Sequence, residues 1–98
     1  MINFEQTAVQ DACEAHNVKR LHVFGSFASG AADNQSDVDL LVKFDREGYE
    51  GAFEQLMAFK ETMETILQRP VDLVVEKPFR NQQFQEEVDR TKRLVYAA

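Results

Sequence analysis

The segment 37–44, which reads Asp-Val-Asp-Leu-Leu-Val-Lys-Phe, is the feature that most restricts how this chain folds. Its apolar character is typical of a β-strand. Because successive side chains of a strand alternate between faces, Asp37 and Asp39 point to one side and the apolar residues at even positions to the other. Two carboxylates on one face raise each other's pKa unless a cation lies between them. Oxygen ligands favour magnesium or manganese, so the segment predicts a divalent metal site.

A second polar feature, the pair Gly25-Ser26, follows the short apolar strand 21–24. Such a turn presents backbone N–H groups and a hydroxyl that suit a polyphosphate. Ten residues lie between Ser26 and Asp37. Either feature alone is more simply explained as a capped turn or a solvated strand end. Together, in this order, they predict a nucleotide site built from two neighbouring strands.

Turn and breaker residues divide the chain into alternating helices and strands. We expect a helix capped by Asn3 to about residue 16, a strand over 20–24, a short helix to about Gly30, a strand over 37–44, a helix over 52–68, a strand over 71–76 and a helix over 80–93. Residues 94–96 are a final turn or a short strand. The order αβαβαβα predicts a single α/β (α+β) domain over residues 1–98, a small mixed sheet packed with helices.

Helical spacing also predicts which side chains are buried. The first helix presents Phe4, Ala8, Ala12 and Ala15. The long helix presents Phe53, Leu56, Met57, Met63, Ile66 and Leu67. The single cysteine, Cys13, is assigned to the core.

Composition limits the class of partner. The net charge of −6 argues against a nucleic-acid surface, and only Arg90, Lys92 and Arg93 cluster among the basic residues. Acidic character suits a basic protein partner better. The sequence shows no membrane-spanning stretch and no leader, and one cysteine cannot form an internal disulfide, so a cytoplasmic location is expected.

The pattern Gly-Ser, ten residues, Asp-x-Asp resembles the signature of the minimal nucleotidyltransferases, the compact branch of the DNA polymerase beta-like superfamily. Members commonly act as the antitoxin of a HEPN-domain ribonuclease toxin. The resemblance implies a third acidic residue on a later strand, which here is Asp72 within Val71–Val75. Alternation allows Asp72 to face the same side as the other two aspartates if its strand lies beside theirs.

The resemblance also implies roles for these residues. Asp37, Asp39 and Asp72 would be the catalytic residues and would hold two Mg²⁺ ions, with Mn²⁺ also possible. Asp72 would act as general base, and Gly25 and Ser26 would bind the phosphates of ATP.

One position departs from the resemblance. Ser29 stands where many relatives carry an arginine, so the turn lacks a cation for the triphosphate. Lys43 lies on the strand face of the aspartates but two side chains farther along.

The function implied is transfer of AMP from ATP to a tyrosine of a HEPN ribonuclease toxin, which would make the chain an adenylyltransferase antitoxin. Two alternatives stay open. The chain could transfer a nucleotide to a small molecule or an RNA end while a partner supplies the acceptor site. It could also be a non-catalytic antitoxin that acts by complex formation.

Overall fold

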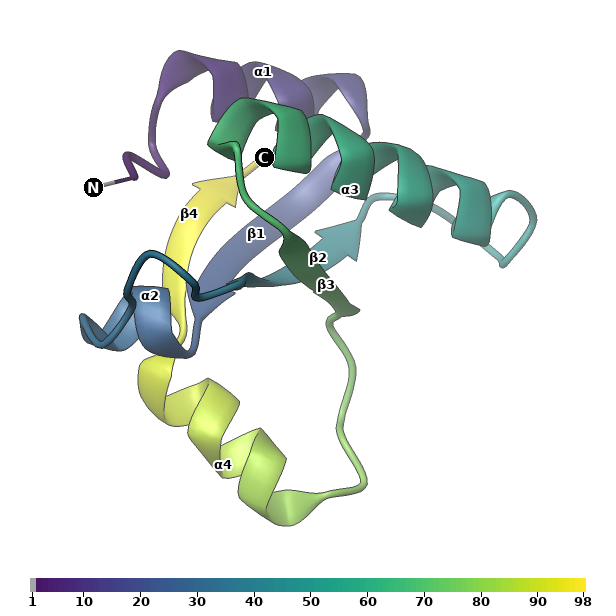
Figure 1. Cartoon of the computed structure of the whole chain (residues 1–98). Coiled ribbons are helices and arrows are strands. Elements are labelled where there is room, and N and C mark those ends of the chain that lie inside the picture. The colour runs from purple at the N-terminus through teal and green to yellow at the C-terminus, as the bar shows by residue number, and fades with distance from the viewer. Residues whose placement is uncertain (1) are drawn as a thin grey trace.

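The computed structural model describes residues 2–98. These residues form one mixed sheet with helices on both faces (Figure 1). The helices are α1 (Thr7–Ala15), α2 (Ser26–Ser29), α3 (Ala52–Leu67) and α4 (Gln82–Thr91), and the strands are β1 (Val18–Phe24), β2 (Val38–Phe44), β3 (Val71–Val75) and β4 (Arg93–Ala97). The predicted α+β class is confirmed. None of the helices in this part of the chain is long and apolar enough to cross a membrane.

The strand order across the sheet is β3-β2-β1-β4. Strand β1 pairs antiparallel with both β2 and β4, whereas β2 and β3 run parallel. A parallel pair needs a crossover connection, and α3 supplies it. The crossover brings the start of β3 beside the start of β2, which is where the predicted metal ligands lie.

The main core lies between the sheet and the helices α1 and α3, which cover the same face (Figure 1). Helix α3 contributes Phe59, Met63 and Leu67 at a spacing of four, and α1 contributes Val9, Ala12 and Cys13. The assignment of Cys13 to the core is confirmed.

The predicted helix faces are wrong in part. Ala8 and Ala15 are exposed, and Val9 is buried in their place. Phe53 is 68% exposed, whereas Phe59 is fully buried. Both errors have one cause. Each helix carries apolar residues on more than one side, and the position of the sheet decides which of these sides faces the core.

A smaller apolar cluster holds α4 against the opposite face of the sheet. Phe24 and Leu41 pack there against Val88 of α4, with Val74 and Phe79 at the margin. These strand residues alternate with core residues such as Val23 and Leu40, so they point away from α1 and α3. Figure 1 shows α4 on the side of the sheet away from α1 and α3.

The structure differs from the sequence prediction in the boundaries of three elements. The order is αβαβαβαβ, because Arg93–Ala97 form an edge strand that the predicted order αβαβαβα omits. Strand β1 begins at Val18, two residues before its predicted start. The Asn3 carboxamide accepts a hydrogen bond from the N–H of Glu5 in a turn, and α1 itself begins four residues later, at Thr7.

Candidate active site

Asp39 and Asp72 lie side by side on neighbouring strands. They are register partners in the parallel β2–β3 pair, and on its other side Asp39 is opposite Phe24 of β1. Residues in register on adjacent strands project to the same face, so both carboxylates share one side of the sheet. This face of the sheet carries Leu41 and packs against α4, and it is opposite to the face that packs against α1 and α3. The predicted adjacency of the two strands is confirmed.

Asp37 precedes β2 and is exposed. The next residue, Val38, donates its N–H to the carbonyl of Pro70 at 3.0 Å, which joins the approach to β2 with the approach to β3. Arg69 strengthens this junction, because its guanidinium donates to the carbonyl oxygen of Ser36 at 3.0 Å. The loop before the aspartates is therefore fixed by hydrogen bonds.

The negative charges of the three aspartates act on one another. Burial raises the pKa of the Asp39 carboxyl above its ordinary value, and the charges of Asp72 and Asp37 raise it further. Among residues 2–98, no side chain donates a hydrogen bond to Asp39 that would offset this effect. The site thus carries an excess of negative charge that a bound cation would relieve.

Gly25 is required where the turn meets Asp39. Its φ is +70°, a conformation that side chains with a Cβ rarely adopt. A Cβ built at this position would lie 2.4 Å from Oδ2 of Asp39, so any other residue forces the carboxylate to move. The absence of a side chain at Gly25 leaves the space into which the carboxylate projects.

The backbone N–H of Gly25 is already used within the protein. It donates to the hydroxyl Oγ1 of Thr91 at 3.1 Å, and Thr91 in turn donates to the carbonyl of Glu87 at 2.8 Å. This N–H is therefore engaged within the protein, and the phosphate-binding role expected of Gly25 stays a prediction. Sequence reasoning missed Thr91, because nothing local marks a contact between residues 66 positions apart.

Ser26 begins the four-residue helix α2 and lines a cavity of about 680 Å³. Ser29 and Arg93 line the same cavity, as does Phe27. None of Asp37, Asp39 and Asp72 lines this cavity. In the sequence, Arg93 stands out only as a member of a basic cluster.

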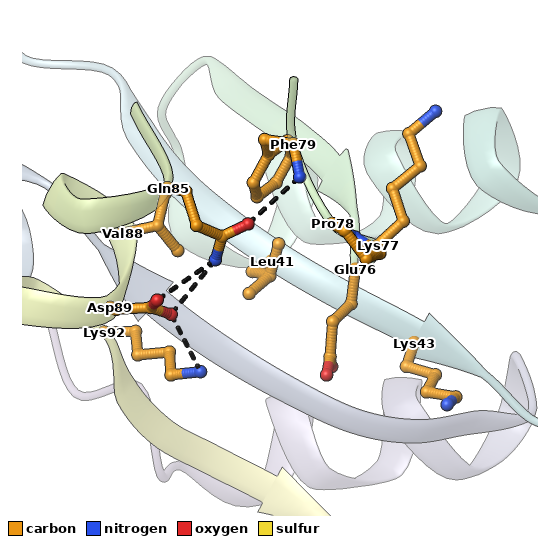
Figure 2. Close-up of a pocket in the computed structure, with 10 residues that line it drawn as sticks. All are labelled: Leu41, Lys43, Glu76, Lys77, Pro78, Phe79, Gln85, Val88, Asp89 and Lys92. Atoms are coloured by element: carbon orange, nitrogen blue, oxygen red, sulfur yellow. Dashed lines mark hydrogen bonds and ion pairs between the residues drawn. The ribbon is translucent and has the colours of Figure 1, made fainter. Parts of the chain in front are cut away.

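A second cavity, of about 470 Å³, lies between α4 and the strands (Figure 2). Leu41 lines it, two residues beyond Asp39 on the same strand face, but none of the three aspartates does. Along the wall of this cavity, the N–H of Phe79 donates to the side-chain oxygen of Gln85. The amide nitrogen of Gln85 donates in turn to Asp89, and Asp89 forms an ion pair with Lys92 at 3.4 Å. This chain of bonds fixes α4 to the loop that follows β3.

Within residues 2–98, no three acidic, histidine or cysteine side chains are already gathered closely enough to form a metal cluster. Asp37 and Asp72 are exposed, whereas Asp39 is half-buried. The carboxylates share a location and an electrostatic field, but their oxygens do not converge on one point.

Comparison with known proteins identifies the class. The model of the nucleotidyltransferase domain family matches residues 6–96. A Methanocaldococcus jannaschii protein, MJ1379, whose name proposes protein adenylyltransferase activity, is 35% identical over 68 residues, which are 69% of this chain and 67% of that protein. The chain belongs to the nucleotidyltransferase domain family, and the resemblance drawn from the sequence is confirmed.

Two solved structures share the fold. A chain in the crystal structure of a toxin–antitoxin with AMP-PNP superposes with a TM-score of 0.73 at 15% identity, over 99% of this chain and 75% of its own length. A chain in the complex of a tri-AMPylated Shewanella oneidensis HEPN toxin with its MNT antitoxin gives a TM-score of 0.59 at 13% identity, over 90% and 66%. At these identities the likeness concerns the fold alone.

The contact between Gly25 and Asp39 can be tested by a double-mutant cycle. Gly25→Ala and Gly30→Ala both place an alanine at positive φ, but only the first contacts Asp39, since nothing lies within 4 Å of a Cβ at Gly30. In urea unfolding, we expect a coupling of roughly 1 kcal/mol between Gly25→Ala and Asp39→Ala. Gly30→Ala and Asp39→Ala should be additive. Additivity for both pairs would contradict the proposed contact.

The raised pKa of Asp39 predicts a pH-dependent stability. The folded state holds the Asp39 proton to a higher pH than the unfolded chain, so stability is lost as pH rises through the folded pKa. Asp39→Asn should therefore be more stable than the wild type at pH 7, and the difference should vanish below the ordinary pKa of about 3.9. Urea unfolding across pH measures this. Asp45→Asn, an exposed carboxylate, serves as the control, and a less stable Asp39→Asn at pH 7 would refute the account.

Proposed function

We propose that this chain is an antitoxin that transfers AMP from ATP to a tyrosine of a partner HEPN ribonuclease toxin and so neutralises it. The observation that carries the proposal is the side-by-side placement of Asp39 and Asp72 on an open strand face, next to the Gly25 turn. Membership of the nucleotidyltransferase family supports the reaction type. The proposed activity in the name of MJ1379 supports a protein acceptor.

The donor set of this site fits a divalent cation. Asp37, Asp39 and Asp72 offer only carboxylate oxygens, the ligands that Mg²⁺ and Mn²⁺ prefer. Burial and then the charges of Asp72 and Asp37 raise the pKa of Asp39, and a bound cation would favour its ionised form. Because Asp37 and Asp72 are exposed, their side chains can turn toward Asp39 without unpacking the core. Two Mg²⁺ ions held there would neutralise charge on the triphosphate and favour ionisation of the acceptor hydroxyl.

The residues of the chain then divide the reaction between them. The acceptor oxygen of the tyrosine forms a bond to the α-phosphorus of ATP, the bond from that phosphorus to the bridging oxygen breaks, and pyrophosphate leaves. The Asp72 carboxylate accepts the proton of the tyrosine hydroxyl. Ser26 donates a hydrogen bond to the departing phosphates, and Gly25 leaves room for Asp39 beside them.

The HEPN partner rests on different support. The sequence pattern resembles antitoxins of HEPN toxins, and a structural neighbour of this chain comes from a complex of a tri-AMPylated HEPN toxin with an MNT antitoxin. The open side of the Asp39–Asp72 face gives a partner side chain access, since α4 packs on Leu41 and leaves Asp72 exposed. A hetero-oligomer of the two proteins follows from this proposal.

A non-catalytic antitoxin is the second candidate, and one observation favours it: the three carboxylates are not gathered into a metal cluster within residues 2–98. In that case the chain would neutralise its toxin by binding alone. Transfer to a small molecule or an RNA end is the remaining alternative, and it differs in the acceptor that becomes labelled.

The decisive experiment uses ATP labelled at the α-phosphate, Mg²⁺ and the HEPN protein encoded beside this chain. We expect label and an AMP mass gain on a toxin tyrosine. The double variant Asp37→Asn/Asp39→Asn should lower labelling at least ~100-fold, because direct metal ligands matter more than the groups that orient them. The double variant should still bind the toxin.

Asp45→Asn is the matched control, because it removes an exposed carboxylate at the far end of β2 and should leave labelling unchanged. Full neutralisation by the double variant would overturn the enzymatic account in favour of complex formation. Label on an RNA or a small molecule instead of the toxin would favour the third alternative.

A further inference from the structure

We propose that the segment 47–54, which joins β2 to the first turn of α3, is a docking surface for a basic surface of the partner toxin. The inference rests on the proposed function for the identity of the partner, and it adds the part of this chain that binds it. The segment reads Glu-Gly-Tyr-Glu-Gly-Ala-Phe-Glu. It follows the end of β2, whereas the candidate metal ligand Asp39 lies near the start of that strand. Figure 1 shows the loop at the end of the molecule where α3 begins.

Two aromatic side chains of this segment are turned out to solvent. Tyr49 is 94% exposed and Phe53 is 68% exposed, which makes them the two most exposed large apolar side chains of residues 2–98. The carbonyl of Tyr49 accepts the N–H of Ala52 at 3.0 Å, so a turn brings both residues to the same end of α3. Neither ring belongs to the apolar clusters that hold the fold together. Exposed aromatic residues that come in a pair are typical anchors of protein interfaces.

The loop that carries these rings is held in one conformation by Arg46. The guanidinium of Arg46 donates to the carbonyl oxygen of Gly48 at 3.1 Å, to that of Glu50 and to the side-chain oxygen of Gln55 at 2.6 Å. The amide of Gln55 donates in turn to the carbonyl of His16 at 3.0 Å, which fixes the loop to the end of α1. A surface that is already ordered loses less conformational entropy when a partner binds it.

The charges around the two rings are all negative. Glu47, Glu50 and Glu54 are exposed, and within residues 2–98 none of their carboxylates takes part in an ion pair or a side-chain hydrogen bond. The segment itself contains no lysine or arginine. An aromatic centre with a charged rim favours a partner whose surface carries the opposite charge. A second copy of this chain, with its net charge of −6, is disfavoured by repulsion.

The proposed partner offers the required charge. A ribonuclease binds the phosphates of its RNA substrate through basic side chains, so a ribonuclease toxin carries a basic surface. Docking on the loop also leaves the candidate active site open. Asp39 and Phe44 are five residues apart on β2, which is roughly 17 Å along the strand. A partner domain about 30 Å across is large enough to contact the loop and to reach the aspartates.

Biolayer interferometry with the immobilised HEPN protein encoded beside this chain tests the aromatic anchors. The double variant Tyr49→Ala/Phe53→Ala should bind this toxin about 30-fold more weakly or worse, because two anchors are lost. Leu94→Ala is the matched control, since Leu94 is 51% exposed and lies outside the loop, and its affinity should equal that of the wild type. Because both rings are exposed, urea unfolding of the double variant should match that of the wild type.

The same assay at low and high salt tests the carboxylates. Glu47→Gln/Glu50→Gln should lower the association rate constant severalfold at low ionic strength, and the difference should disappear at about 0.5 M salt, where charges are screened. Glu5→Gln/Glu86→Gln removes the same net charge from exposed positions elsewhere and should have a smaller effect. Equal effects of the two pairs would show that net charge alone acts, and would overturn the proposal.

Three other results would also overturn it. They are an unchanged affinity of the aromatic double variant, no binding of the toxin by the wild-type chain, and a chain that is dimeric by itself and becomes monomeric in the aromatic double variant without a change in toxin binding. The outcome is separable from that of the proposed function. Toxin binding that depends on Tyr49 and Phe53 supports the docking surface even if no tyrosine is labelled. Labelling with an unchanged KM for the toxin in the aromatic double variant refutes the docking surface alone.

Discussion

The parallel register of β2 and β3 is the constraint on which the candidate site depends. It sets Asp39 beside Asp72, while the antiparallel partner β1 ends opposite Asp39 and delivers Gly25 to the same place. Burial of Asp39, together with the nearby charges of Asp72 and Asp37, raises the pKa of its carboxyl, so the ionised form of Asp39 destabilises the folded chain. The proposed site for cations and a polyphosphate would use this arrangement.

Helix α4 turns these strand ends into a defined site. Its apolar contact through Val88 holds it on the sheet, and the hydrogen bonds through Gln85 fix it to the loop after β3. The hydroxyl of its last residue, Thr91, then accepts a hydrogen bond from the N–H of Gly25. The C-terminal part of the chain thus supports a motif that lies near its start.

The sequence predicts the local parts of the site and not its distant ones. The strand 37–44 and the Gly-Ser turn are visible because period-two patterning and turn chemistry are local properties. Residues 94–96 fit either a turn or a short strand, because so short a segment has too few residues to show a period. The role of Thr91 cannot be read from the sequence, because it arises from a contact between segments far apart in the chain. Phe59, in place of Phe53, is buried because the sheet selects among adjacent apolar stripes of α3.

The central claim is that ATP and a divalent cation bind where the end of β1 lies beside the starts of β2 and β3. The most direct measurement is paramagnetic broadening of backbone amide signals in the ¹⁵N-labelled chain, with substoichiometric Mn²⁺ and ATP. The account predicts that broadening centres on Asp39, Asp72 and Gly25 and requires ATP for its full extent. Broadening centred on Glu76 and Asp89, at the cavity of Figure 2, or spread evenly over exposed carboxylates, would contradict it.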